Sequence, residues 1–301
     1  MRLIHTADWH LGKHIEGHSR LEEQELFLED FVNIVKERDA DVVLIAGDIY
    51  DSSNPPAKAE QLFYDTLKKI SDGGRRLTIV IAGNHDNPDR LVSATPLAME
   101  HGIIMVGTPK TVIPKGQYGS WKVCRSGEGY IKIERKSEQA VVLTVPFPSE
   151  KRLEEVLYSE MESEEIQLET YNERLRCLFD RLADQFEEET VNIIVSHLFV
   201  MDSLEEGSER SIQLGGSYLA DPDIFPKLAD YVALGHIHRP QSVPGHPNIR
   251  YSGSTVVRHS YPQSILRQTR IYLCRDFQVQ QTPGRTGYAL REVALCTEEP
   301  L

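Results

Sequence analysis

Three short apolar runs in the first 86 residues constrain the fold most strongly, because each has the length of one buried strand and each ends in polar residues. The runs are MRLIHTAD at 1–8, ADVVLIAGD at 40–48 and RRLTIVIAGNHD at 75–86. Residues 20–38 and 52–70 separate them and carry apolar side chains at helical spacing. Strands that alternate with helices favour a parallel sheet covered by helices. The sequence therefore predicts an α/β fold.

A change of pattern at 103–147 predicts a second sheet, because short β-rich pieces there are separated by turn residues. Strand patterns return at 191–198 and 230–238. Residues 150–189 hold 14 Asp and Glu against 5 Lys and Arg, and their apolar residues recur at helical spacing, which indicates a helix with a solvated charged face. Most of the net charge of −13 therefore lies in one segment, which weakens the argument that an acidic protein does not bind nucleic acid.

The composition narrows the class of protein. With 301 residues and 40% hydrophobic side chains, the chain has enough apolar material for a substantial core. No apolar stretch approaches the ~20 residues of a membrane helix, and no signal-peptide pattern is present, so we expect a cytoplasmic protein without a membrane partner. The four cysteines are far apart and lack CxxC spacing, which argues against a zinc knuckle or a disulfide scaffold.

Five of the predicted strands end in residues of the type that bind metals. These residues are Asp8, His10, Asp48, Asn84, His85, His197, His236 and His238. In open α/β sheets, ligands gather beyond the carboxyl ends of the strands, so these side chains are expected to converge at one edge. Imidazole ligands suit Mn, Fe or Zn, whereas a set made only of oxygen atoms would suit Mg or Ca. The sequence therefore predicts a histidine-rich metal centre.

The same motifs, in their order along the chain, resemble a known group. D-x-H at 8–10, G-D at 47–48, G-N-H-D at 83–86, S-H at 196–197 and G-H-x-H at 235–238 are similar to the five signature blocks of the calcineurin-like metallophosphoesterases. Within that superfamily, HTADWHLGK, GDIYDSSNPP, GNHDNPDRL and YVALGHIHRPQ most resemble the SbcD-type DNA-repair exonucleases, which partner the SMC-like ATPase SbcC. The resemblance implies a two-sheet β-sandwich flanked by helices, and DNA as the substrate.

The resemblance also implies which residues hold two metals. One metal would be held by Asp8, His10, Asp48 and His238. The other would be held by Asp48, Asn84, His197 and His236, so that Asp48 bridges. Two Mn²⁺ ions are expected, with Fe or Zn as alternatives and Mg²⁺ disfavoured.

Residues next to the ligands are candidates for other parts of the reaction. By the same resemblance, His85 would act as general acid for the leaving oxygen or bind the phosphate. Asp86 is a second catalytic candidate, which would hold the His85 imidazole in position, or else serve only as the partner of a helix cap. Asp51 is a candidate for substrate contact or a loop cap, and Arg90 for a DNA phosphate or a surface salt bridge. Lys13, His14 and Arg20 would form a small basic lip on the DNA path.

The resemblance spans residues 1 to about 253 and fails after YSGST. We therefore expect a metallophosphoesterase domain at 1–255 and, at 256–301, a divergent or truncated tail without the family's capping domain and partner-binding helices. The apolar residues from Ile265 to Val279 predict at most short strands there. Binding of the SbcC-type ATPase is not expected with such a tail, whereas a homodimer is, through the predicted helices at 52–67 and 87–102.

Two other functions compete with a DNA nuclease. A phosphatase or phosphodiesterase of the same superfamily would act on another phosphoester with the same metal ligands, so the ligands do not separate it from a nuclease. An inactive scaffold protein is disfavoured, because every ligand position is filled.

Overall fold

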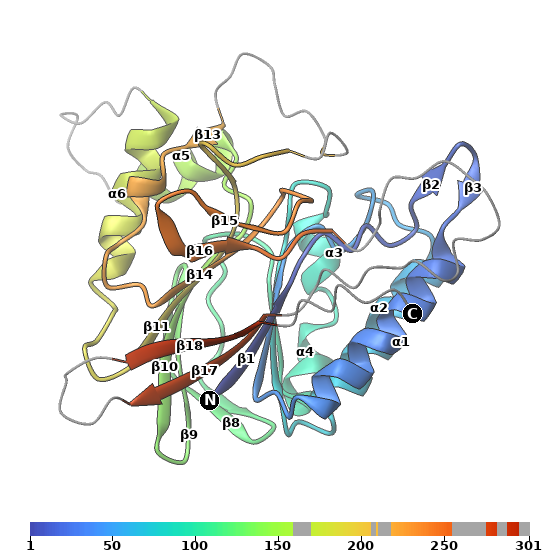
Figure 1. Cartoon of the computed structure of the whole chain (residues 1–301), viewed down its shortest axis with the longest axis horizontal. Coiled ribbons are helices and arrows are strands. Elements are labelled where there is room, and N and C mark those ends of the chain that lie inside the picture. The colour runs from blue at the N-terminus through green and yellow to red at the C-terminus, as the bar shows by residue number, and fades with distance from the viewer. Residues whose placement is uncertain (159–169, 206–208, 210–217, 255–274, 282–287, 295–301) are drawn as a thin grey trace.

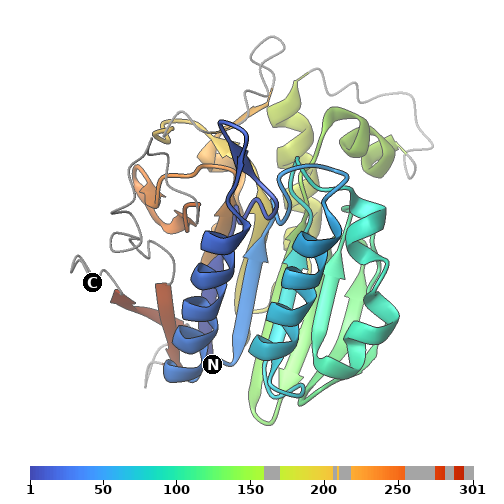
Figure 2. The ribbon, with the colours of Figure 1, turned by 90° about the vertical axis from the view of Figure 1, so that its right-hand side faces the viewer.

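The computed structural model describes residues 1–158, 170–205, 209, 218–254, 275–281 and 288–294 (Figure 1). Two β-sheets face each other, and helices cover the outer face of each (Figures 1 and 2). The predicted two-sheet β-sandwich flanked by helices is confirmed. Among the described residues, no helix has the length and apolar character needed to cross a membrane.

The first sheet has the strand order β18-β17-β1-β4-β5-β6. Its bounds are β1 (Arg2–Thr6), β4 (Val42–Ala46), β5 (Leu77–Ile81), β6 (Ile103–Val106), β17 (Arg275–Gln281) and β18 (Tyr288–Ala294). Strands β1, β4, β5 and β6 are parallel, as the alternation of strands and helices predicts. Both faces of these strands are buried, which is why each reads as a continuous apolar run.

The second sheet has the order β15-β16-β14-β11-β10-β9-β8-β7. Its bounds are β7 (Gly116–Tyr118), β8 (Trp121–Gly127), β9 (Tyr130–Arg135), β10 (Glu138–Val145), β11 (Val191–His197), β14 (Tyr231–Gly235), β15 (Gln241–Val243) and β16 (His246–Tyr251). Strands β10, β11, β14 and β16 are parallel, whereas β7 to β10 form an antiparallel meander. This meander is the predicted β-rich region.

Helices α1 (Leu21–Glu37) and α2 (Ala57–Ser71) cover the first sheet, where Phe31 and Phe63 are fully buried (Figure 2). The short helices α3 (Pro88–Val92), α4 (Thr95–Ala98) and η1 (Met99–His101) follow β5. Helices α5 (Glu150–Tyr158) and α6 (Tyr171–Ala183) cover the second sheet. The acidic segment thus contains the predicted surface helix, since α6 buries Leu175 and Phe179 against that sheet.

The remaining elements are short. They are β2 (His14–Ile15) and β3 (His18–Ser19), which form a hairpin, β12 (Phe199–Val200) and β13 (Leu219–Ala220), which pair in parallel, and η2 (Pro222–Ile224).

Part of the predicted tail belongs to the first sheet. Strand β17 pairs antiparallel with β1, with Leu3 opposite Phe277, and β18 pairs with β17. Residues 255–274, which contain most of the apolar positions singled out for the tail, lie outside the described residues. The domain boundary at 255 therefore stays a prediction.

Candidate metal centre

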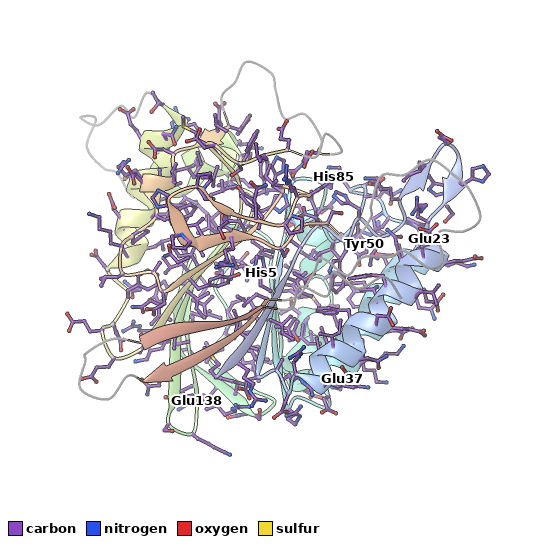
Figure 3. The ribbon with its side chains drawn as sticks, in the orientation of Figure 1. His5, Glu23, Glu37, Tyr50, His85 and Glu138 are labelled. Carbon is purple, nitrogen blue, oxygen red and sulfur yellow. The ribbon has the colours of Figure 1, made fainter. Side chains whose placement is uncertain are left out.

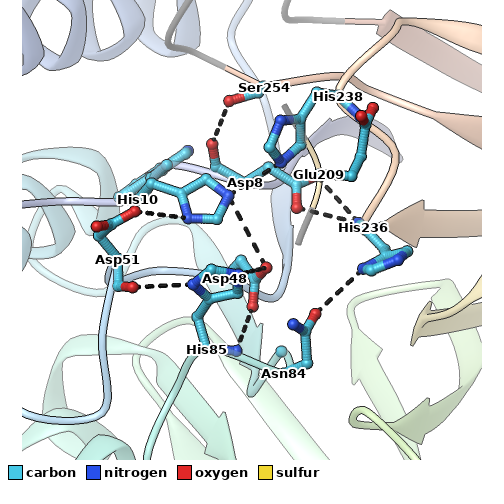
Figure 4. Close-up of polar contacts among 12 residues, drawn as sticks. Asp8, His10, Asp48, Asp51, Asn84, His85, Glu209, His236, His238 and Ser254 are labelled. Atoms are coloured by element: carbon cyan, nitrogen blue, oxygen red, sulfur yellow. Dashed lines mark hydrogen bonds and ion pairs between the residues drawn. The ribbon is translucent and has the colours of Figure 1, made fainter. Parts of the chain in front are cut away.

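The structure brings the predicted ligands together from five strand ends (Figure 4). Asp8 and His10 follow β1, Asp48 follows β4, Asn84 follows β5, His197 ends β11, and His236 and His238 follow β14. The first sheet thus contributes four of these side chains and the second sheet three. Contacts of β4 with β11 and β14 join the two sets.

One cluster consists of Asp8, His10 and His238, whose potential ligand atoms all lie within 4.8 Å of one another. His10 Nε2 and His238 Nε2 are 3.0 Å apart. Two imidazole nitrogens at this separation fit two neighbouring ligands of one ion, because metal–nitrogen bonds of ~2.1 Å at right angles place the nitrogens ~3 Å apart. All three residues are almost completely buried.

The other cluster consists of Asp48, His197 and His236, again with their potential ligand atoms within 4.8 Å. Asn84 joins it, because its Oδ1 lies 2.9 Å from His197 Nε2 and 3.1 Å from His236 Nδ1. Asp48 Oδ2 is 3.4 Å from His197 Nε2 and 3.8 Å from His10 Nε2. Asp48 therefore lies between the two clusters, where a bridging ligand is expected.

Burial and neighbouring charges set the protonation states of this centre, and three of its histidines are neutral. Burial lowers the pKa of His236 to about 3 and that of His238 to about 4, so both rings are neutral at neutral pH. Burial likewise lowers the pKa of His10 well below its usual value. Against the effect of burial, the charge of His197 lowers the pKa of Asp48 well below its usual range. Against the effect of burial, the charge of Asp48 in turn raises the pKa of His197 to about 9, and burial raises the pKa of Asp8 well above its usual range. A cation bound here would replace the protons of His197 and Asp8, because metal ligands bind in their deprotonated form.

Neighbouring backbone groups orient the ligands. His197 Nδ1–H donates to the Ala46 carbonyl at 2.8 Å, which directs Nε2 toward Asp48 and Asn84. The Asp8 carboxylate accepts the backbone N–H of His236 at 3.0 and 3.1 Å. Such outer contacts fix the tautomer and the orientation of metal ligands.

The backbone at the strand ends is strained in the way that functional sites often are. Asp8, His10, Asp48 and His236 have φ angles of 57°, 46°, 51° and 100°. Residues other than glycine rarely adopt this region, which costs of order ~1 kcal/mol or more at each position. Four of the predicted ligands share this feature, which points to a site that function maintains.

A family comparison agrees with this geometry. The family model described as "Calcineurin-like phosphoesterase" matches residues 1–240. The chain belongs to the calcineurin-like phosphoesterase family. Two curated relatives are both named as the SbcD component of the nuclease SbcCD, which makes this phosphoesterase an SbcD-type member of the family.

The similarity to these relatives extends along most or all of the phosphoesterase chain. The protein from Bacillus subtilis (strain 168) is 43% identical over 302 residues, which cover 100% of this chain and 71% of the relative. The protein from Rhodobacter capsulatus is 34% identical over 258 residues, which cover 84% of this chain and 62% of the relative. The family and the two clusters together identify a divalent metal cofactor.

Glycines precede three of the candidate ligands of this phosphoesterase for a steric reason. A Cβ atom on Gly83 would lie 2.1 Å from Asp48 Oδ1. On Gly47 or Gly235, it would lie 2.4 or 2.7 Å from His197 Nδ1. The G-D, G-N and G-H pairs of the sequence thus leave room for ligand side chains that arrive from other strands.

His85 lies beside both clusters, with its side chain 12% exposed (Figures 3 and 4). Its Nδ1–H donates to the backbone carbonyl of Asp51 at 2.8 Å. Its Nε2 lies 3.9 Å from Asp48 Oδ2, and its backbone N–H donates to Asp48 Oδ1 at 2.9 Å. The ring therefore presents Nε2 toward the centre.

Asp86 does not take the position that was expected from the sequence. Its carboxylate accepts the backbone N–H groups of Gly83, Ile49 and Tyr50 at 2.9, 3.2 and 3.0 Å, and the Asp51 carbonyl orients the His85 ring instead. Asp86 is also not the helix cap, because Asn87 accepts the N–H groups at the start of α3. Burial raises the pKa of Asp86 to about 6. This carboxylate joins the loop after β4 to the loop after β5.

The predicted DNA-contact residues form contacts within the protein. Arg90 forms the surface salt bridge, with two contacts of 2.7 and 3.0 Å to the Glu60 carboxylate. Lys13 Nζ lies 4.0 Å from Asp51 Oδ1. His14 Nδ1–H donates to the Gly12 carbonyl at 3.0 Å in the hairpin of β2 and β3, and Arg20 pairs with Glu23 where α1 begins.

Sequence reasoning missed two residues of the site. Glu209 Oε1 accepts the backbone N–H of His238 at 3.0 Å, and no motif surrounds it in the sequence. Ser254 Oγ donates to the Asp8 carbonyl at 2.8 Å. Its position at the end of IRYSGS (249–254), the last segment in which the sequence resembles the family, was the available signal.

Proposed function

We propose that this chain is an SbcD-type nuclease that hydrolyses phosphodiester bonds of DNA with two bound Mn²⁺ ions. The observation that carries the proposal is the pair of neighbouring clusters, in which Asp48 belongs to one cluster and also lies 3.8 Å from His10 of the other. Two divalent ions held close together supply Lewis-acid stabilisation of both the attacking and the leaving oxygen and lower the pKa of a bound water.

The ligand sets follow the two clusters. Asp8, His10, Asp48 and His238 hold one ion. Asp48, Asn84, His197 and His236 hold the other. Histidine-rich sites with some oxygen ligands suit Mn²⁺, Fe or Zn better than Mg²⁺. Asn84 contributes a neutral oxygen, which limits the negative charge that opposes an anionic phosphate.

His85 acts on the leaving group in this proposal. Because its Nδ1–H is held by the Asp51 carbonyl, Nε2 is the nitrogen that exchanges a proton. In the imidazolium form, Nε2–H donates to the leaving oxygen of the cleaved DNA strand, as a general acid. His85 thus carries the proton transfer, and the buried histidines serve as metal ligands.

The choice of DNA rests on the relatives, which are named as nucleases. We propose exonuclease activity on duplex ends and endonuclease activity on single strands, in DNA repair and recombination. The relatives are named as one component of SbcCD, so we propose an SbcC-type ATPase as partner, and a homodimer of this chain. Co-elution of the two proteins tests this partnership against the expectation drawn from the sequence of residues 256–301.

The test offers purified protein three labelled substrates in parallel: duplex DNA, single-stranded DNA and a phosphoprotein. With Mn²⁺ we expect cleavage of both DNA substrates, loss of activity in EDTA, and no dephosphorylation of the protein substrate. Asp48→Asn is the inactive control, because it removes the charge between the clusters. Dephosphorylation without DNA cleavage would favour the phosphatase alternative and refute the nuclease.

A further inference from the structure

We propose that Asp51 is the positioning residue of this centre: its carboxylate orients His10, and its backbone carbonyl orients His85. The inference deepens the proposed function and rests on it only for the identity of the bound metal. The sequence alone suggested a substrate contact or a loop cap for Asp51, and the contacts below assign it a different part.

The two nitrogens of His10 face different partners. Nε2 points toward His238 Nε2 at 3.0 Å and Asp48 Oδ2 at 3.8 Å. Nδ1 is buried without a hydrogen-bond partner, and Asp51 Oδ1 is 3.5 Å from it (Figure 4). A neutral imidazole that offers Nε2 to a metal must carry its proton on Nδ1. With an ion bound at Nε2, the Asp51 carboxylate 3.5 Å away would accept that proton in a hydrogen bond, and the three groups would form a carboxylate–histidine–metal triad.

The same residue orients the second ring. The backbone carbonyl of Asp51 accepts His85 Nδ1–H at 2.8 Å. The His10 and His85 rings pack edge to face, with centroids 4.7 Å apart. Potential ligand atoms of His10, Asp51 and His85 all lie within 4.8 Å of one another. Asp51 thus contacts a metal ligand with its side chain and the proposed general acid with its main chain.

The fold holds Asp51 beside His10 through the backbone. His10 N–H donates to the Asp48 carbonyl at 3.0 Å, and Leu11 N–H to the Ile49 carbonyl at 2.9 Å. Asp51 N–H then donates to the Leu11 carbonyl at 3.2 Å. These bonds join the segments after β1 and β4 in parallel register, so the position of Asp51 relative to His10 does not depend on side-chain packing alone.

Two other roles fit these contacts less well. A carboxylate repels a DNA phosphate, so Asp51 is a poor direct contact for DNA. As a ligand of either proposed ion, its side chain would need to reach past the His10 ring, because it faces Nδ1 while Asp48 and His238 face Nε2. The Lys13 ammonium lies 4.0 Å from Asp51 Oδ1, and its positive charge suits contact with a DNA phosphate better.

The test measures Mn²⁺ binding by calorimetry on the full chain for Asp51→Asn and Asp51→Ala. Loss of an outer carboxylate partner typically weakens metal affinity by roughly 10- to 100-fold. We expect that loss in one of the two Mn²⁺ sites, smaller for Asn because it keeps an acceptor oxygen. We also expect two equivalents at saturating Mn²⁺. Asp65→Asn, an exposed position on α2, is the charge-matched control and should bind Mn²⁺ like the wild type.

Each outcome decides the proposal. Wild-type Mn²⁺ affinity in both Asp51 variants would overturn it. Loss of a full equivalent at saturating Mn²⁺ would show that Asp51 is a direct ligand. A higher KM for DNA with unchanged Mn²⁺ affinity would show that Asp51 contacts DNA. Either result would overturn the proposal that Asp51 positions the two histidines. Circular dichroism in EDTA checks that the near-isosteric Asn variant is folded. If the wild type binds Mn²⁺ but does not cleave DNA, the proposed function is refuted. The Mn²⁺ affinities of the wild type and the Asp51 variants still test the role of Asp51 in that case.

Discussion

At the scale of single residues, backbone carbonyls decide which nitrogen of a histidine faces the centre. Ala46 accepts from His197 Nδ1–H, and Asp51 accepts from His85 Nδ1–H. The two rings differ in surroundings, because His197 is fully buried among ligands and His85 is partly exposed at the rim. We therefore expect substitutions of the two residues to separate metal binding from turnover.

His85→Asn should keep both Mn²⁺ equivalents and lose turnover by roughly 10²- to 10⁴-fold, the usual effect of removing a general acid. Single-turnover cleavage of labelled DNA and elemental analysis of the desalted, Mn²⁺-loaded protein measure the two properties. His101→Asn, at an exposed histidine of η1, is the matched control. Cleavage by His85→Asn at the wild-type rate would show that another group supplies the proton.

His5 makes the fold sensitive to acid. It lies on β1 inside the molecule, with Nδ1 3.0 Å from the Tyr231 hydroxyl, and burial lowers its pKa to about 3 (Figure 3). Between that value and about 6.5, the unfolded chain binds up to one more proton than the folded chain, so stability falls as pH falls, by up to about 1.4 kcal/mol per pH unit.

Urea unfolding in EDTA between pH 4 and pH 7.5 tests this. The free energy of unfolding of His5→Gln should start lower at pH 7.5, because packing is lost, but decline less steeply with acid than that of the wild type. The other buried histidines titrate in both proteins and cancel in the comparison. Parallel curves would contradict the assignment to His5.

At the scale of elements, the position of each candidate ligand depends on how closely neighbouring strand ends approach one another. Gly83→Ala should displace Asp48, because its Cβ would lie 2.1 Å from Asp48 Oδ1 and 2.3 Å from the Asp48 backbone nitrogen. A displacement of about 1 Å at a reacting group can cost roughly 10²-fold in rate, and we expect a loss of that order together with weaker Mn²⁺ binding.

Gly17→Ala is the control for Gly83→Ala. Gly17 has a φ of +81°, so an added Cβ is strained there, but it would meet no atom within 4 Å. That variant should lose stability of order ~1 kcal/mol and keep Mn²⁺ binding and turnover. Gly83 does not share this positive φ, so equal effects of the two substitutions would mean that a general loss of stability, and not contact with Asp48, explains the result at Gly83.

At the scale of the whole molecule, the centre joins the two sheets. Asp8, His10, Asp48 and Asn84 follow strands of the first sheet, whereas His197, His236 and His238 belong to the second. A ligand that binds only the folded state stabilises it by about 3 kcal/mol at a concentration of 100 Kd. Because each ion needs ligands from both sheets, metal binding should stabilise the two sheets together.

Thermal unfolding should therefore shift to higher temperature in a single transition when Mn²⁺ is added, and return when EDTA is added. Asp48→Asn should abolish most of the shift, because its side chain lies between both clusters. Two separate transitions, of which Mn²⁺ moves only one, would contradict a shared centre.

The sequence by itself determined the features that depend on local patterns. Apolar runs such as VVLIA at 42–46 predict buried strands, because a strand with both faces covered has no polar positions. The candidate ligands could also be picked out from the sequence, because metal binding restricts residue type and these residues stand at or just after the ends of strands. The alternation of strands and helices predicted the parallel order of β1, β4 and β5.

Only the tertiary structure decided which atoms meet. Asp86 was expected beside His85, its neighbour in sequence, yet its carboxylate accepts N–H groups of the loop that follows β4 and the Asp51 carbonyl takes the His85 ring. Likewise, β17 pairs with β1 although about 270 residues separate them in sequence. Local patterns restrict the conformation of a segment, but hydrogen bonds between distant segments depend on how the whole chain packs, and no single segment encodes that.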